Sequence, residues 1–161
     1  MHAAGMILRP FEFEDLRWAA PLAERCFSPW DQGYGQQTAD WLAQDNIRGW
    51  VATAAETPLG FVLLGAWGVP EGVQVWEIVL IAVDPTTARK GVGRSLIAQV
   101  LRAVRTEPFV REVRLDVDPT NAAAVGLFQQ AGFTVQQENA GTFSGGQPAV
   151  RMAWRPKHRS N

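Results

Sequence analysis

The feature that most constrains this chain is the apolar run Ile81–Pro85, followed by a glycine pair at Gly91 and Gly93. The run predicts a buried strand that stops at Asp-Pro, and residues 93–105 predict an amphipathic helix. Strand, short basic loop and helix N-terminus thus follow one another. The free backbone N–H groups at such an N-terminus form an anion site suited to a pyrophosphate. A glycine pair alone is also compatible with a simple tight turn, so the second half of the chain has to decide.

Length and composition predict one globular domain spanning residues 1–161, with an ordered core over about 6–155. The chain has 161 residues, 47% of them hydrophobic and 19% charged, which suits a single full core. A net charge of −1 gives no electrostatic indication of a nucleic-acid partner. The single Cys26 excludes an intrachain disulfide, and His2 and His158 lie near the two ends, so we expect no metal site.

The termini and the apolar runs bear on location. No apolar run approaches the ~20 residues of a transmembrane helix. The first residues also lack a signal-peptide pattern. We therefore expect a cytoplasmic protein without a membrane partner.

Hydrophobic periodicity predicts a mixed α/β domain. The predicted strands are 6–9, 50–54, 59–67, 73–83, 112–117, 133–137 and 149–154, and the predicted helices are 15–26, 38–44, 93–105 and 121–131. Asn121 should cap the last helix and Gly132 should end it. A turn is expected at 56–58, and the polar, glycine-rich residues 138–147 predict an exposed, mobile hairpin loop.

A second motif lies at 115–133 and carries a family resemblance. It reads Leu-Asp-Val-Asp-Pro-Thr-Asn at 115–121 and ends in Gly-Phe at 132–133. With the first motif it resembles the GNAT superfamily of acetyl-CoA-dependent N-acetyltransferases. There the stretches read like I-A-V-x-P-x-x-R-x-x-G-x-G-R-x-L and L-E-V-x-x-x-N-x-x-A-x-x-L-Y-x-x-x-G-F. The chain is most similar to the ribosomal-protein N-terminal (alanine) acetyltransferases, whose C-F-x-x-P-W segment resembles residues 26–30. The resemblance covers residues 6–154.

The resemblance implies a fold and an activity. The fold is the GNAT (acyl-CoA N-acyltransferase) fold, an α/β arrangement with a mixed, mostly antiparallel central sheet flanked by helices and splayed at the coenzyme site. The implied activity is acetyl transfer from acetyl-CoA to a primary amine, above all an N-terminal α-amino group of a ribosomal or other protein. A small-molecule amine acetyltransferase and a non-catalytic acyl-CoA-binding module remain alternatives, because a fold does not fix a substrate. The resemblance is compatible with a monomer or a homodimer.

The coenzyme site implied by the resemblance combines a cradle and a slot. The N–H groups of residues 89–95 would cradle the phosphates, with charge from Arg89, Lys90 and Arg94. The backbone of residues 81–83 would pair with the pantetheine. Asn121 would contact the coenzyme, a role compatible with capping a helix. The predicted coenzyme-binding residues are Ile81, Ala82, Val83, Arg89, Lys90, Gly91, Val92, Gly93, Arg94, Ser95, Asn121 and Phe128.

Two carboxylates are candidates for the catalytic base, because the incoming amine is protonated at pH 7 and must lose its proton. Asp116 occupies the position of the family's general-base glutamate, and Glu77 lies where many members carry a strand carboxylate acting through water. Asp116 also fits an ordinary solvated strand residue. Glu77 interrupts an apolar strand and needs a partner or a cavity. We favour Glu77.

Phe128 is the largest departure from the family pattern, which places there a tyrosine that protonates the leaving thiolate. Phenylalanine keeps the packing of the ring and removes the O–H group. Tyr34, the chain's single tyrosine, is distant in sequence. It could help only if its loop folds over the thiol.

Overall fold

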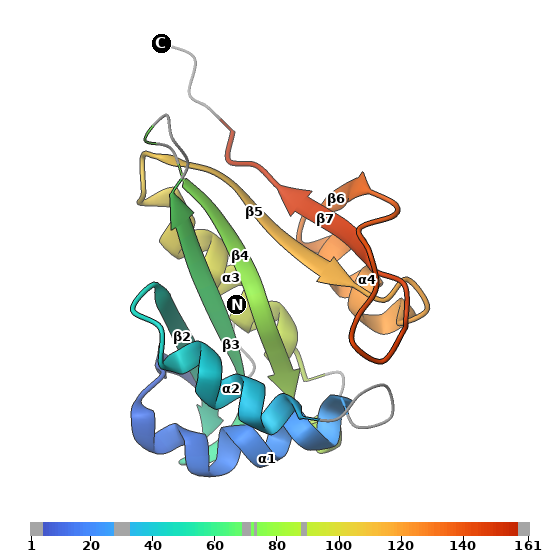
Figure 1. Cartoon of the computed structure of the whole chain (residues 1–161). Coiled ribbons are helices and arrows are strands. Elements are labelled where there is room, and N and C mark those ends of the chain that lie inside the picture. Colours follow the sequence, from blue (N-terminus) through green and yellow to red (C-terminus); the bar gives the residue numbers. More distant parts are fainter. Residues whose placement is uncertain (1–4, 28–32, 69–71, 73, 88–89, 158–161) are drawn as a thin grey trace.

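A seven-stranded sheet organises the chain, with strand order β1-β2-β3-β4-β5-β7-β6 (Figure 1). The structure, a computed structural model, describes residues 5–27, 33–68, 72, 74–87 and 90–157. The strands are β1 (Met6–Pro10), β2 (Ile47–Ala54), β3 (Thr57–Gly68), β4 (Gln74–Val83), β5 (Val110–Val117), β6 (Thr134–Gln137) and β7 (Val150–Trp154). β4 and β5 pair in parallel, and the other neighbouring strands pair antiparallel. The predicted mixed, mostly antiparallel sheet is therefore confirmed.

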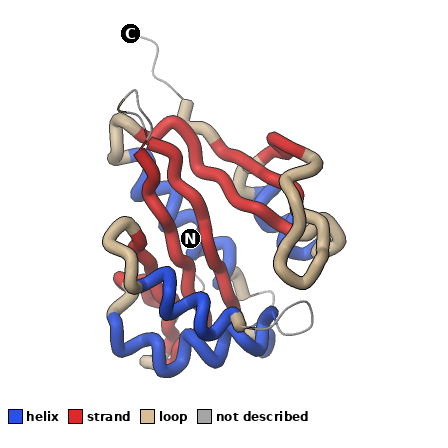
Figure 2. Tube along the Cα trace, viewed as in Figure 1, coloured by secondary structure: helices blue, strands red, loops and turns tan. Residues whose placement is uncertain are grey.

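Helices cover both faces of the sheet (Figure 2). They are α1 (Leu16–Phe27), α2 (Tyr34–Leu42), α3 (Val92–Arg105) and α4 (Ala122–Gln130), with short 3-10 helices η1 (Phe13–Asp15) and η2 (Pro85–Thr87). α1 and α2 pack on one face and α3 and α4 on the other, each pair enclosing a hydrophobic core. The predicted order of strands and helices is confirmed. No helix in the described ranges is both long and apolar enough to cross a membrane.

Several predicted boundaries differ by two or more residues from the structure, and two of them have a clear cause in the backbone. The β2–β3 turn lies at Ala55 and Glu56, which both have positive φ (49° and 69°), and not at 56–58. This is the backbone of a two-residue hairpin turn, in a sequence without the usual Asn-Gly. α2 begins at Tyr34, and not at residue 38, because Gly33 (φ 93°) adopts the left-handed cap conformation that starts the helix. The start predicted for β4, Val73, lies outside the described residues.

A β-bulge at Val79 reverses the faces of β4. Leu63 pairs with Leu80 while Leu64 pairs with Ile78, so Val79 is an extra residue on β4. In a regular strand Ile78 and Leu80 would point to the same face. Here Ile78 joins the core under α3 and α4, and Leu80 joins the core under α1 and α2. β4 therefore contributes side chains to both cores, and the alternation of its two faces shifts beside the cleft described next.

Candidate active site

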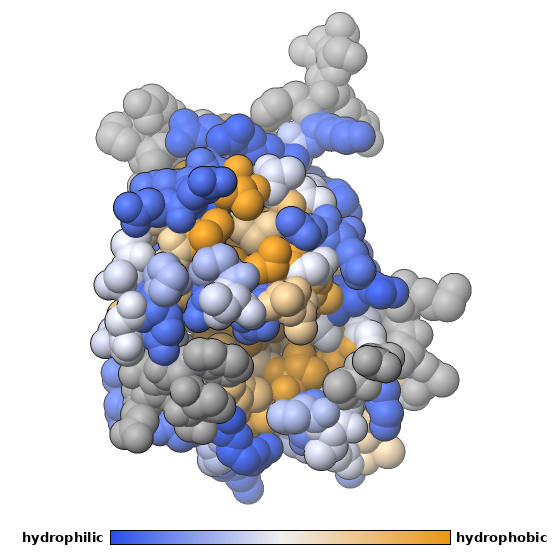
Figure 3. All heavy atoms as spheres, turned by 90° about the vertical axis from the view of Figure 1, so that its right-hand side faces the viewer, coloured by the Kyte–Doolittle hydropathy of each residue, from blue (hydrophilic) through white to orange (hydrophobic). Residues whose placement is uncertain are grey.

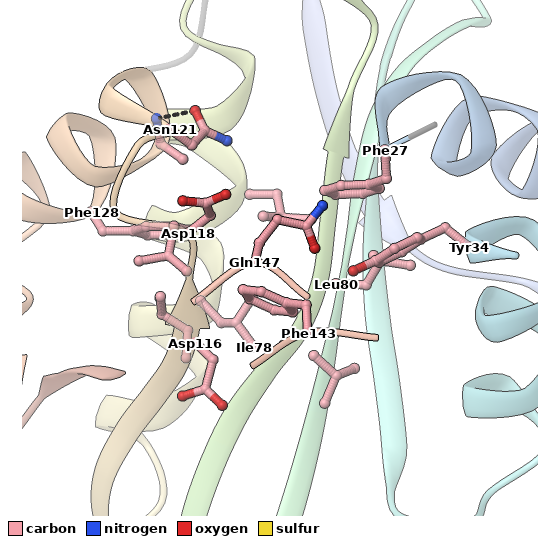
Figure 4. A pocket seen from close by; sticks show the side chains of 15 residues that line it. Phe27, Tyr34, Ile78, Leu80, Asp116, Asp118, Asn121, Phe128, Phe143 and Gln147 are labelled. Carbon is pink, nitrogen blue, oxygen red and sulfur yellow. Dashed lines mark hydrogen bonds between the residues drawn. The ribbon is translucent and has the colours of Figure 1, made fainter. Parts of the chain in front are cut away.

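A cleft opens where β4 and β5 part. The two strands pair only from Gln74↔Val110 to Glu77↔Arg114, and beyond that point their facing edges diverge. The space between them is lined by Phe27, Tyr34, Ile78, Val79, Leu80, Ile81, Leu115, Asp116, Val117, Asp118, Asn121, Ala124, Phe128, Phe143 and Gln147. In Figure 4, Phe27 and Tyr34 form one wall, Asn121 and Phe128 the other, and Phe143 reaches between them. Most of the lining is apolar, with its polar groups on a few side chains.

The N-terminus of α3, where the anion cradle was predicted, has exposed and uncapped backbone geometry. Gly91 precedes the helix in the left-handed conformation (φ 80°), and no side chain caps it. The first-turn N–H groups and the positive end of the helix dipole can therefore receive a phosphate. The side chains of Val92 and Ser95 are buried, so only their backbones could reach a ligand. Lys90 and Arg94 are exposed beside the cradle, and Arg89 lies outside the described residues.

The pantetheine slot predicted at residues 81–83 lies at the end of β4, on the edge that β5 leaves unpaired. Of the three predicted residues only Ile81 lines the cleft. Ala82 is buried in the core under α1, and the carbonyl oxygen of Val83 accepts a hydrogen bond from the Cys26 thiol at 3.3 Å. The free edge of β4 that faces the cleft runs from Ile78 to Ile81. The bulge, which no periodicity argument predicts, lies within this segment.

The two carboxylate candidates lie together on one face of the sheet. Glu77 Oε1 is 3.5 Å from Arg114 Nε, and Asp116 accepts hydrogen bonds from Arg151 at 3.0 and 3.4 Å. Burial raises the pKa of Glu77, and the charge of Asp116 raises it further, against the lowering effect of Arg114. Asp116 lines the cleft directly, whereas Glu77 sits half-buried just beyond its inner end. The two groups thus differ in access and in partners.

Asn121 and Phe128 line the cleft from α4. The Asn121 side-chain oxygen accepts a hydrogen bond from Ala124 N–H at 3.2 Å, so it caps α4 as predicted while its side chain faces the cleft (Figure 4). Phe128 is 4% exposed and packs against Phe133, with ring centroids 5.8 Å apart. Its ring forms part of the cleft wall and carries no proton to give.

Eleven of the fifteen lining residues were not predicted as site residues, and among them Phe27, Tyr34, Phe143 and Gln147 come from segments outside the two motifs and β4. Phe143 and Gln147 come from residues 138–147, which the sequence predicted as an exposed, mobile hairpin loop. Most of this loop is exposed, and Phe143 and Gln147 are the exceptions that are half-buried in the cleft. The loop is held by hydrogen bonds from Phe143 N–H to the Gln147 carbonyl and from Ala149 N–H to the Gly141 carbonyl. A signal existed, because Phe143 is the one large apolar residue in this polar stretch.

The surface around the cleft is mixed in polarity. Figure 3 shows hydrophobic residues along the middle of the face on the side of α4, β6 and β7, bordered by hydrophilic ones. Within the described ranges, no cluster of three or more histidine, cysteine or acidic side chains could hold a metal ion.

Comparison with known proteins identifies the family. The chain matches the model of the acetyltransferase (GNAT) family over residues 12–133, which is more than half of its length, and it belongs to that family. The fold agrees: the ribosomal-protein-S18-alanine N-acetyltransferase from Escherichia coli superposes with a TM-score of 0.77 at 21% identity, over 96% of each chain. NAA60 of Arabidopsis thaliana in complex with acetyl-CoA gives 0.74 at 16% identity, covering 93% of this chain and 98% of that one. The predicted GNAT fold is confirmed.

Two groups of acetyltransferases are found among the curated relatives. A mycothiol acetyltransferase of Salinispora tropica is 31% identical over 139 residues, covering 80% of this chain and 45% of that protein. A ribosomal protein bS18-alanine N-acetyltransferase of Salmonella typhimurium is 36% identical over 76 residues, covering 45% of this chain and 51% of that protein. The chain spans about half the length of the curated relatives it matches.

Proposed function

We propose that this chain transfers acetyl from acetyl-CoA to a primary amine, and that the acceptor is the N-terminal α-amino group of a peptide or protein. The observation that carries the proposal is the parting of β4 and β5 beyond Glu77 and Arg114. It exposes a free strand edge, bordered by the bulge at Val79, in the same domain as the uncapped N-terminus of α3. A free strand edge can pair with amide groups, and a helix N-terminus can bind phosphates. Acetyl-CoA carries both, because its pantetheine arm contains amides and is joined to a diphosphate.

The residues present fit acetyl-CoA. The carbonyl and N–H groups of residues 78–81 on the β5 side are free to pair with the pantetheine amides. Gly91 keeps the approach to the first turn of α3 open, since a Cβ built there has no heavy atom within 4 Å. Lys90 and Arg94 add positive charge from the exposed surface. When bound, acetyl-CoA supplies an activated carbonyl carbon to an amine.

Glu77 is the base we favour. An amine attacks only when neutral, so its proton must leave towards a carboxylate, directly or through water. The half-buried Glu77 has a raised pKa, which makes it a better proton acceptor than an ordinary carboxylate. Asp116 borders the cleft but is held by two hydrogen bonds from Arg151, which occupy its oxygens.

The aromatic wall supports a peptide acceptor. Phe27, Tyr34 and Phe143 present rings opposite α4, together with the apolar Val79 and Leu80. Such a surface stabilises an apolar side chain near the amino group. A polyhydroxylated amine would bury hydroxyl groups here against few polar partners, at a cost of about 1–3 kcal/mol for each unpaired group.

A small-molecule amine is the second candidate. It is supported by the relatives that match over 80% of this chain, which are named for mycothiol. The matches to ribosomal-protein acetyltransferases cover a smaller part, 45% of the chain.

One screen separates these candidates. Purified protein is incubated with acetyl-CoA and equal concentrations of short peptides and amino sugars, and the products are read by mass spectrometry. Peptides of the same sequence with a blocked N-terminus serve as the matched control. We expect acetylation of free α-amino groups only. Acetylation of amino sugars alone would establish the second candidate, and tight acetyl-CoA binding without transfer would establish a binding module.

A further inference from the structure

A thioester acetyl transfer ends with a thiolate that needs a proton. A free thiol has a pKa of about 8.5, so its expulsion is faster when an acid lies beside the sulfur. Most of the fifteen side chains that line the cleft cannot serve: they are hydrocarbons, amides or carboxylates. Tyr34 is the one lining residue with a phenolic O–H group.

The fold brings Tyr34 to the wall opposite Phe128. In Figure 4 its ring extends from the start of α2 into the cleft beside Leu80, with the hydroxyl directed into the space between the two walls. Phe128 faces that space from α4 with a ring of the same shape but without a hydroxyl. The cleft thus has an aromatic ring on each side and a phenol on one side only.

Several contacts fix the position of Tyr34. Its ring stacks on Phe27, with centroids 4.4 Å apart and planes at 25°. The Thr38 hydroxyl donates a hydrogen bond to the Tyr34 carbonyl at 2.8 Å. Gly35 lets α2 lie close to α1, because a Cβ at that position would be 3.0 Å from the Ala20 carbonyl oxygen. A side chain held in this way pays little entropy to act at a defined point.

We propose, resting on the acetyl-transfer function above, that Tyr34 is the catalytic acid of this chain. The amine lone pair forms the new C–N bond, and the C–S bond breaks with its electron pair going to sulfur. The phenolic O–H of Tyr34 gives its proton to that sulfur. The proton lost by the amine goes to the Glu77 carboxylate or to water, and the tyrosinate regains a proton from solvent. Atoms and charges balance without any further reactant.

Steady-state kinetics test the role. Tyr34→Phe keeps the ring and should lower kcat by roughly 10²-fold, the usual span for general acid catalysis, with acetyl-CoA affinity unchanged by calorimetry. Adding Phe128→Tyr to that variant returns a hydroxyl to the opposite wall and should restore part of kcat. Each variant is assayed on the amine that the wild type acetylates, whether peptide or amino sugar, so an error about the acceptor does not affect this test.

A spectroscopic measurement tests the placement without turnover. Tyr34 is the single tyrosine, so ultraviolet difference spectra report its ionisation alone. The protein is titrated with bound CoA and with bound desulfo-CoA, which lacks only the sulfur. A thiolate beside the hydroxyl opposes its ionisation, so we expect a higher tyrosine pKa with CoA.

The proposal is overturned by an unchanged kcat in Tyr34→Phe, or by a loss confined to the acceptor KM that Phe128→Tyr does not relieve. It is also overturned by tyrosine titrations that are identical with the two coenzymes.

Discussion

Glu77 and Arg114 are the last residues to pair across β4 and β5, and their side chains form an ion pair at the point where the strands part. The pair therefore marks the inner end of the cleft. Arg114 limits the rise that burial imposes on the pKa of Glu77 without cancelling it. A carboxylate with a raised pKa at the closed end of a cleft is well placed to take a proton from an amine.

Replacing Glu77 tests its role as base. Glu77→Gln should lower kcat/KM at pH 7 by roughly 10²-fold, because the amide cannot accept the amine proton. The wild-type kcat/KM should rise with pH through the raised pKa of Glu77, since only the ionised carboxylate is active. In Glu77→Gln this rise with pH should be absent. Asp116→Asn should cost less, because Asp116 is already engaged by Arg151.

Glu107→Gln is the control for removing a carboxylate. Glu107 forms an exposed 3.8 Å ion pair with Arg48 outside the cleft, so its loss should leave the kinetics unchanged. An inactive Asp116→Asn beside a near-normal Glu77→Gln would reverse the assignment and make Asp116 the base.

If the N-terminus of α3 binds the phosphates of the coenzyme, substitutions of Gly91 and Gly93 should lower the affinity for acetyl-CoA. Gly91→Val places a branched side chain in the open space before α3 and strains a left-handed residue by about 1–2 kcal/mol. Acetyl-CoA binding, measured by calorimetry, should weaken at least tenfold. Gly93→Val should weaken it too, partly because its Cβ would lie 2.9 Å from Leu127 and press on α4. Gly126→Ala, where a Cβ on α4 meets nothing within 4 Å, should bind normally. Unchanged affinity in both valine variants would refute the cradle.

Local patterns predicted the elements because each pattern has a local cause. The order of strands and helices followed from hydrophobic periodicity, and the Asn121 cap followed from a side chain that bonds its own helix. The bulge at Val79 was not predictable in this way. Its residues continue an unbroken apolar run, so the change of face is decided by the pairing with β3 and by helices on both sides.

The composition of the cleft was only partly predictable for the same reason. The glycines at the start of α3 and the two carboxylates stand in motifs, whereas Tyr34 and Phe143 reach the cleft through packing between distant segments. Tyr34 depends on the close approach of α2 to α1, which Gly35 permits. Phe143 depends on hydrogen bonds within its own loop. Tertiary contacts of this kind leave no periodic signal in the chain.

Asp15 should make stability depend on pH. Its carboxylate accepts two hydrogen bonds from Arg9, one from Glu12 N–H and one from Trp18, and the Arg9 bonds lead in lowering its pKa to about 2. A lowered pKa means that the stabilisation is present above the ordinary value of 3.8 and is lost as pH falls towards 2. Asp15→Asn should lower the free energy of unfolding by about 2 kcal/mol at pH 7, measured with urea.

The difference between wild type and Asp15→Asn should shrink as the pH falls from 4 to 2. Asp40→Asn, on the exposed face of α2, is the control and should change stability by no more than about 0.5 kcal/mol. A difference that stays constant over this pH range would show that the loss comes from packing and not from the ionised carboxylate.

Replacing Phe143 tests which wall of the cleft receives the acceptor. The ring is half-buried and reaches between the wall of Phe27 and Tyr34 and the wall of Asn121 and Phe128. Phe143→Ala should raise KM for a peptide acceptor about tenfold, because a lost aromatic contact of about 1.4 kcal/mol corresponds to that factor. Acetyl-CoA affinity should not change. Phe109→Ala removes a ring that is 65% exposed and outside the cleft, and should alter neither quantity. A weaker acetyl-CoA affinity with an unchanged acceptor KM would place Phe143 on the donor side, and the peptide would then have to enter along another wall.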